Sequence, residues 1–185
     1  MPDRLARLIM VTLSNITVTK DIEVSDRDIW SALVGAFEGG SNYWYWAEPI
    51  LPEGMTSSRM KPEWNSLVKA ENDKRLRAMK HADSGNLNFL PFRERAEEDF
   101  GFLKQHNVYV YIHQIPFLGG SLRITQDSAD GKELGILDYA AIERGMQLFA
   151  EEGGSHWDDF YGKNGDAITY DVMLQLMVMG KVVYG

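Results

Sequence analysis

The sequence predicts an α+β fold in which a small antiparallel sheet of three to five strands packs against several helices. Two periodicities carry this prediction: short segments alternate apolar and polar residues, and longer segments repeat apolar residues every three to four positions. The third observation is composition, because 185 residues with 44% hydrophobic and 25% charged content are enough to bury one core. We therefore expect a single domain over residues 1–185.

The first predicted elements are a strand over 15–24 and the helix that follows it. Residues 15–24 alternate apolar and polar side chains in the manner of a half-buried strand. Ser25, followed three residues later by Asp28, resembles a capping box at a helix start. We expect Gly39 and Gly40 to end this helix, because glycine readily adopts the left-handed conformation that satisfies the last carbonyl groups.

Residues 48–104 differ in character from the rest of the chain and are predicted to be an elaboration or insertion. Prolines punctuate the start of this stretch, and its charge density then rises. Pro62 is well placed to open a helix that runs to about His81. A second short helix is expected over 91–104, with a brief strand over 87–90 between the two.

Two strands, 107–114 and 121–126, are predicted to pair as an antiparallel hairpin. The loop of residues 115–120 between them ends in two glycines, which suits a reversal of the chain. A turn at Asp130 and Gly131 then leads into the final third of the chain.

The final third is predicted to be helical. Asp138 is a suitable N-cap for a helix through Ala150, and a further helix follows Asp166 and runs to Met179. Its apolar residues lie on all sides, so we expect this last helix to be largely buried, with Gly180 closing it.

Composition excludes several classes of function. The chain has no cysteine, so disulfides and thiolate chemistry are absent and a reducing cytosol is expected. The formal charge of −8 opposes binding to a phosphate backbone. The apolar stretch 172–183 is interrupted and too short to span a membrane, and residues 1–10 do not resemble a signal peptide.

Few residues are arranged as a catalytic or metal site would require. The four histidines are scattered, without the spacing of a shared metal, and no serine has the flanks of a nucleophile elbow. The sequence HWDD, residues 156–159, is more simply a helix start than a catalytic set. We expect no catalytic residue, no metal and no cofactor. The basic residues of segment 61–80 are interpreted as a solvated helix face in preference to a phosphate track.

The most unusual segment joins two glycines to four consecutive aromatic residues. Its backbone amides and short polar side chains suit an anion or a polar ligand, and its rings suit a nucleobase or a cation. If the aromatics extend as a strand, Tyr43 and Tyr45 face one way and Trp44 and Trp46 the other. The alternative is a helix end followed by a core strand. The predicted ligand-binding residues are Glu38, Gly39, Gly40, Ser41, Asn42, Tyr43, Trp44 and Tyr45.

Two segments of the chain, AFEGGSNYWY at 36–45 and GDAITYDVMLQLMVMGKVVYG at 165–185, resemble a family of small uncharacterised proteins encoded by bacteriophages. A GGSL segment, the helix LDYAAIERGMQLFAE and the turn HWDDF add to the resemblance. Residues 48–104 do not take part in it. The resemblance assigns no catalytic residue, and it implies an accessory protein that acts in the cytosol of a bacterial host.

Three functions follow as hypotheses. The first is a counter-defence or host-modulating binding protein that sequesters a nucleotide-like small molecule, with a site at a homo-oligomer interface as one arrangement, or that binds a host protein. The second is an enzyme acting on a nucleotide or sugar through Glu38, Asp158 or Asp159, with His156 assisting. The third is a DNA-associated structural protein that uses the Lys69–Lys80 patch.

Overall fold

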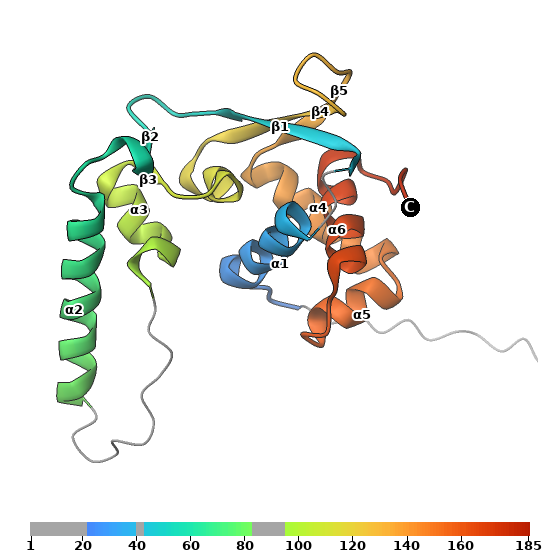
Figure 1. Ribbon diagram of the computed structural model, residues 1–185. Helices are drawn as coiled ribbons and strands as arrows, with labels where there is room; N and C mark the ends of the chain where they lie inside the picture. Colours follow the sequence, from blue (N-terminus) through green and yellow to red (C-terminus); the bar gives the residue numbers. More distant parts are fainter. Residues whose placement is uncertain (1–21, 40–42, 83–94) are drawn as a thin grey trace, which may run out of the picture.

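The structure is a computed structural model that describes residues 22–39, 43–82 and 95–185 (Figure 1). The α-helices and strands, in chain order, are α1 (Asp26–Glu38), β1 (Tyr45–Ile50), β2 (Thr56–Ser57), α2 (Trp64–Ala82), α3 (Phe100–His106), β3 (Val108–Tyr109), β4 (Ser121–Gln126), β5 (Glu133–Leu137), α4 (Tyr139–Glu152), α5 (Ser155–Tyr161) and α6 (Ala167–Met179). Short 3-10 helices cover Ser58–Met60, Ala96–Glu98 and Ile112–Leu118.

A three-stranded antiparallel sheet in the order β1-β4-β5 lies on one side of helices α1, α4 and α6 (Figure 1). A separate two-stranded parallel sheet joins β2 to β3. The α+β prediction is therefore confirmed, including an antiparallel sheet of three strands. Because β1 pairs only with β4 in this sheet, it forms one of the two edges.

The main core fills the space between the sheet and these helices. Alternate residues of β4, Leu122 and Ile124, face the helices and are completely buried. Leu33 from α1, Ile142 from α4 and Leu174 from α6 close the core from the other side. Burial of large apolar side chains of this kind stabilises a fold by roughly 1.5–3 kcal/mol each.

A second, smaller core lies between α2 and α3, beside the parallel strand pair. Trp64 of α2 packs against Phe102 and His106 of α3, with ring centroids 5.5 and 6.3 Å apart. Leu103 and Val108 are completely buried in this cluster. Helix α2 stands apart from the main sheet, as the green helix at the left of Figure 1.

The predicted helix starts are confirmed where a local cap defines them. Ser25 accepts a hydrogen bond from the Asp28 amide at 3.2 Å, and Asp138 accepts one from the Ala141 amide at 2.7 Å. Asp166 caps α6 in the same way. Each of these side chains satisfies a backbone N–H that the helix itself leaves without a partner.

The predicted hairpin of residues 107–126 is wrong. The predicted strand 121–126 is confirmed as β4, but of residues 107–114 only Val108 and Tyr109 form a strand, which pairs in parallel with β2, and residues 112–118 wind into a 3-10 helix. The buried amide of Gln114 favours this path, because its oxygen accepts hydrogen bonds from the backbone of residues 110 and 111 and its nitrogen donates to the Glu97 carbonyl. Strand β4 instead forms a hairpin with β5, a strand that was not predicted from the sequence.

Two other expectations are only partly covered by the structure. Residues 22–24 of the predicted strand 15–24 are not in a strand, and residues 15–21 lie outside the described residues. The helix expected over 91–104 begins only at Phe100, where Asp99 accepts hydrogen bonds from the Gly101 and Phe102 amides. Residues 91–94 and the strand expected over 87–90 also lie outside the described residues.

Candidate functional site

The 38–45 block connects the end of α1 to the start of β1. Glu38 is the last residue of α1, and Gly39 caps it; both are exposed. Gly39 is right-handed at φ −85°, so the left-handed conformation expected of it is wrong. Glycine is favoured at this position for a steric reason, because a Cβ on residue 39 would collide with the Gly35 carbonyl oxygen. Gly40, Ser41 and Asn42 lie outside the described residues.

The four aromatic residues divide into a buried pair and an exposed pair. Trp44 and Tyr45 are 1% and 6% exposed, whereas Tyr43 and Trp46 are 57% and 52% exposed. The predicted alternation, with Tyr43 and Tyr45 on one face, is therefore wrong. The strand begins only at Tyr45, and the bend at Trp44 allows two consecutive rings to enter the core.

Trp44 is fixed by polar and aromatic contacts with the C-terminal part of the chain. Its indole Nε1 donates a hydrogen bond of 2.6 Å to Oδ1 of Asp171 in α6. Its ring stacks on Tyr184, with centroids 5.2 Å apart and planes within 12°. The ring of Tyr45 meets Phe37 of α1 edge-on at 5.5 Å. These contacts hold the two inner rings rigidly.

Asp171 and Gln175 form the polar centre of this arrangement. The second carboxylate oxygen of Asp171 accepts a 2.8 Å hydrogen bond from the Gln175 amide nitrogen. That nitrogen also donates to the Tyr184 carbonyl, and the Gln175 oxygen accepts from the Val183 and Tyr184 amides. Gln175 thereby fixes the chain that follows α6 against the helix.

The Asp171 carboxylate also acts on the neighbouring tyrosines. Desolvation and the negative charge of Asp171 both raise the pKa of Tyr45, whose buried hydroxyl has no hydrogen-bond partner among the described residues. The pKa of Tyr43 is raised by desolvation and by its interaction with Asp171. Both phenols therefore stay protonated at neutral pH, so neither acts as a phenolate base.

Neither Asp171 nor Gln175 was among the site residues predicted from the sequence. Both lie in a helix whose other residues are mostly apolar, and both are buried. Two polar side chains four residues apart on one face of such a helix are a signal that could have indicated an internal hydrogen-bond network. Through this network the structure brings together the two segments, 36–45 and 165–185, on which the phage resemblance depends.

His113 lies next to this region in the main core. It is only 3% exposed, stacks on Tyr111 at 5.4 Å, and lies 5.9 Å from the ring of Trp30 and 6.1 Å from that of Phe37. Burial lowers the pKa of His113 to about 4, so the imidazole is neutral at pH 7. Its Nε2 has no hydrogen-bond partner among the described residues.

The residues of the enzyme hypothesis lie on two helices, Glu38 at the end of α1 and His156, Asp158 and Asp159 on α5. The imidazole Nδ1 of His156 lies 3.4 Å from the Thr169 hydroxyl, and Asp158 and Asp159 are exposed. In the described ranges, no hydrogen bond or ion pair links Glu38 to any of these side chains. Nor do three His, Asp or Glu side chains of the described residues gather as a metal site would require.

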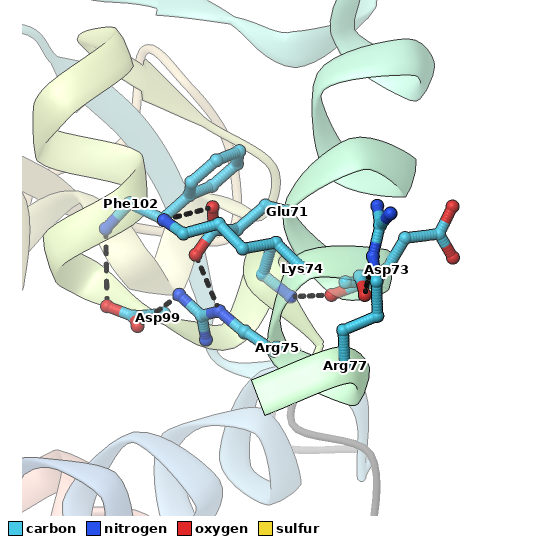
Figure 2. A network of polar contacts seen from close by, with 9 residues as sticks. Glu71, Asp73, Lys74, Arg75, Arg77, Asp99 and Phe102 are labelled. Atoms are coloured by element: carbon cyan, nitrogen blue, oxygen red, sulfur yellow. Dashed lines mark hydrogen bonds and ion pairs between the residues drawn. The ribbon is translucent and has the colours of Figure 1, made fainter. Parts of the chain in front are cut away.

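Several cations of the basic segment 61–80 are paired with carboxylates (Figure 2). Lys69 pairs with Asp73 at 3.0 Å. Arg75 reaches Glu71 at 2.9 Å and Asp99 at 2.7 Å, so it links α2 to the N-cap of α3. Partial burial acts to lower the pKa of Arg75, but the carboxylates of Glu71 and Asp99 outweigh it, so the pKa of Arg75 is raised. Pairing of this kind leaves less positive charge for a phosphate backbone.

Elsewhere, the described residues line open cavities of about 300, 360 and 590 Å³. The first borders the ion pair of Lys163 with Asp28, the second lies between α2 and α3, and the third lies between α1 and α4. None of the three is lined by a described residue of the 38–45 block.

No family model, curated protein or solved structure matches the chain. The resemblance to bacteriophage proteins therefore stays a prediction. Among the described helices, none combines the length and apolar character needed to cross a membrane.

Proposed function

We propose that the protein acts by binding and not by catalysis, and that Tyr43 and Trp46 contact a protein of the bacterial host. The observation that carries this proposal is the division of the aromatic block. Trp44 and Tyr45 are buried in the core, where Trp44 is held by a hydrogen bond and a stacked ring, while Tyr43 and Trp46 are more than half exposed. A rigid inner pair reduces the entropy lost when the outer pair binds a partner.

The neighbours of Trp46 support a protein partner. Trp46, Glu48 and Ile50 alternate along β1 and share the face turned away from the core. Glu48 there forms an ion pair with Arg123 of β4. Exposed tryptophan, tyrosine and arginine side chains supply much of the binding energy of known protein interfaces.

The resemblance to bacteriophage proteins supports the host context. On that basis the partner is a component of host defence or host physiology, and the protein is an accessory factor of infection. Sequestration of a nucleotide-like small molecule is the second form of the proposal. It is supported by the exposed ring of Tyr43, which directly follows the 38–42 segment and has a face on which a base could stack.

The test compares three variants of the tagged protein produced in bacterial cells: Trp46→Ala, Tyr43→Ala and the control Tyr161→Ala. Tyr161 lies on α5 and is 51% exposed, so it matches the tested rings in type and exposure. Native mass spectrometry of the purified proteins detects a bound host protein or a bound small molecule, and circular dichroism confirms folding.

We expect a host protein to accompany the wild type and the control, and its recovery to fall roughly ten-fold with Trp46→Ala. A retained small molecule that is lost only with Tyr43→Ala supports the second form instead. If neither is retained, or if all three variants behave as the wild type does, the proposal is wrong.

A further inference from the structure

The largest of the three cavities is a groove with an apolar floor between helices α1 and α4. Its volume is about 590 Å³. Ile29 of α1 and Ile142 and Met146 of α4 form the floor, and the half-buried ring of Trp157 forms one wall. Residues 142 and 146 are one helical turn apart, so the floor runs along α4. We call this feature the α1–α4 groove.

The charged groups that line the groove are both acidic. Asp26 stands at the start of α1 and Glu143 on the exposed side of α4, and none of the described lining residues is basic. Asp26 accepts a 2.7 Å hydrogen bond from the hydroxyl of Tyr139, which joins α1 to α4 across this feature. The groove therefore combines an apolar floor with a negatively charged rim.

We propose that the α1–α4 groove binds a short basic amphipathic segment of another protein. An amphipathic helix laid into a hydrophobic groove is a recurring mode of peptide recognition, in which apolar residues at helical spacing occupy the floor. Lysine or arginine side chains beside that apolar stripe then meet Asp26 and Glu143. The flexible side chain of Met146 suits such a floor, because methionine adapts to the shape of different ligands.

Charge complementarity is the reason to prefer this occupant. The chain carries a net charge of −8, so the field around the acidic rim attracts a cationic segment and repels an anionic ligand such as a nucleotide. The site is separate from Tyr43 and Trp46 and goes beyond the function proposed above, so either proposal stands without the other.

The experiment measures binding of a fluorescent peptide to the full-length protein by anisotropy. The probe is a lysine–leucine peptide of about five helical turns, with leucines spaced to form one apolar stripe. A scrambled peptide of the same composition keeps the charge but lacks the stripe. Two variants of α4 carry the same charge change: Glu143→Lys in the groove rim, and Glu152→Lys on the opposite side of the helix.

We expect saturable binding of the amphipathic peptide, roughly ten-fold tighter than that of the scrambled peptide. Glu143→Lys weakens this binding by about ten-fold and Glu152→Lys by less than about two-fold. Equal binding of the two peptides, equal weakening by the two variants, or no saturable binding by the wild type would each overturn the proposal. Both substitutions are at exposed positions, so the fold is expected to survive them, and urea unfolding checks this.

Discussion

At the scale of single residues, a few buried polar side chains determine how the candidate site is built. Asp171 receives hydrogen bonds from Trp44 and Gln175, and Gln175 in turn holds the backbone of residues 183 and 184. Each of these groups would be costly to bury without partners. The hydrogen bonds of Asp171 thus anchor Trp44, which lies in the chain between the exposed rings Tyr43 and Trp46.

Replacement of Asp171 by alanine tests this network. The change leaves the indole N–H of Trp44 and one N–H of Gln175 without acceptors, so we expect the free energy of unfolding to fall by about 2–3 kcal/mol. Urea unfolding measures the effect. Asp159→Ala, which removes an exposed carboxylate of α5, is the matched control and should change stability little. Equal stability of the two variants would contradict the role given to Asp171.

His113 predicts a pH dependence. Its pKa is about 4 in the folded protein and 6.5 in a solvent-exposed chain, so the unfolded state takes up the proton first as the pH falls. Its stabilising contribution is complete above pH 6.5 and declines between pH 6.5 and 4, by a total on the order of 3 kcal/mol.

The measurement compares wild type with His113→Phe, which keeps an aromatic ring in place but cannot take up a proton. We expect the wild type to lose stability relative to the variant over this pH range. Urea unfolding at several pH values follows the difference. A difference that stays constant from pH 7 to pH 4 would show that His113 is not a neutral buried histidine.

At the scale of elements, local signals predicted the capped helices and the bounds of β4, but not which strands pair. Ser25, Asp138 and Asp166 cap helices through bonds to residues three positions away, so a short stretch of sequence contains the whole signal. The pairing of β4 depends on β1 and β5. Strand β5 was missed because Gly135 interrupts its pattern; a Cβ there would lie 2.5 Å from the Val178 carbonyl oxygen of α6.

The crossing of α4 and α6 depends on Gly145. A Cβ at this position would collide with the backbone of Met177, so the two helices approach too closely for any side chain. Alanine is the better helix former by about 1 kcal/mol, yet we expect Gly145→Ala to destabilise the protein by about 1–3 kcal/mol through overpacking. Thermal or urea unfolding gives the sign of the stability change caused by Gly145→Ala. An increase in stability would show that α4 and α6 can move apart without cost.

At the scale of the whole molecule, the last residues of the chain close the core around the aromatic block. Tyr184 stacks on Trp44, and residues 183 and 184 make three hydrogen bonds with Gln175. The two cores are also linked, because Phe100 and Tyr109 pack against both. That residues 48–104 are an elaboration or insertion stays a prediction.

Removal of residues 181–185 should therefore affect a distant segment. We expect a loss of about 3 kcal/mol in the free energy of unfolding, since three hydrogen bonds contribute roughly 1 kcal/mol each. The near-ultraviolet circular dichroism of Trp44 should change as well. Lys181→Ala, a change of one exposed side chain, is the control. Truncation without effect on either measurement would contradict the closing role of this segment.

The sequence by itself determined the α+β class, the capped helices and the unusual aromatic block, because periodicity and capping act over a few neighbouring residues. Only the tertiary structure decided which rings are buried, which strands pair and which polar residues meet. Trp44 and Asp171 are separated by 127 positions in the chain. Trp44 is buried where it makes that contact, and no local pattern can specify a partner so distant in sequence.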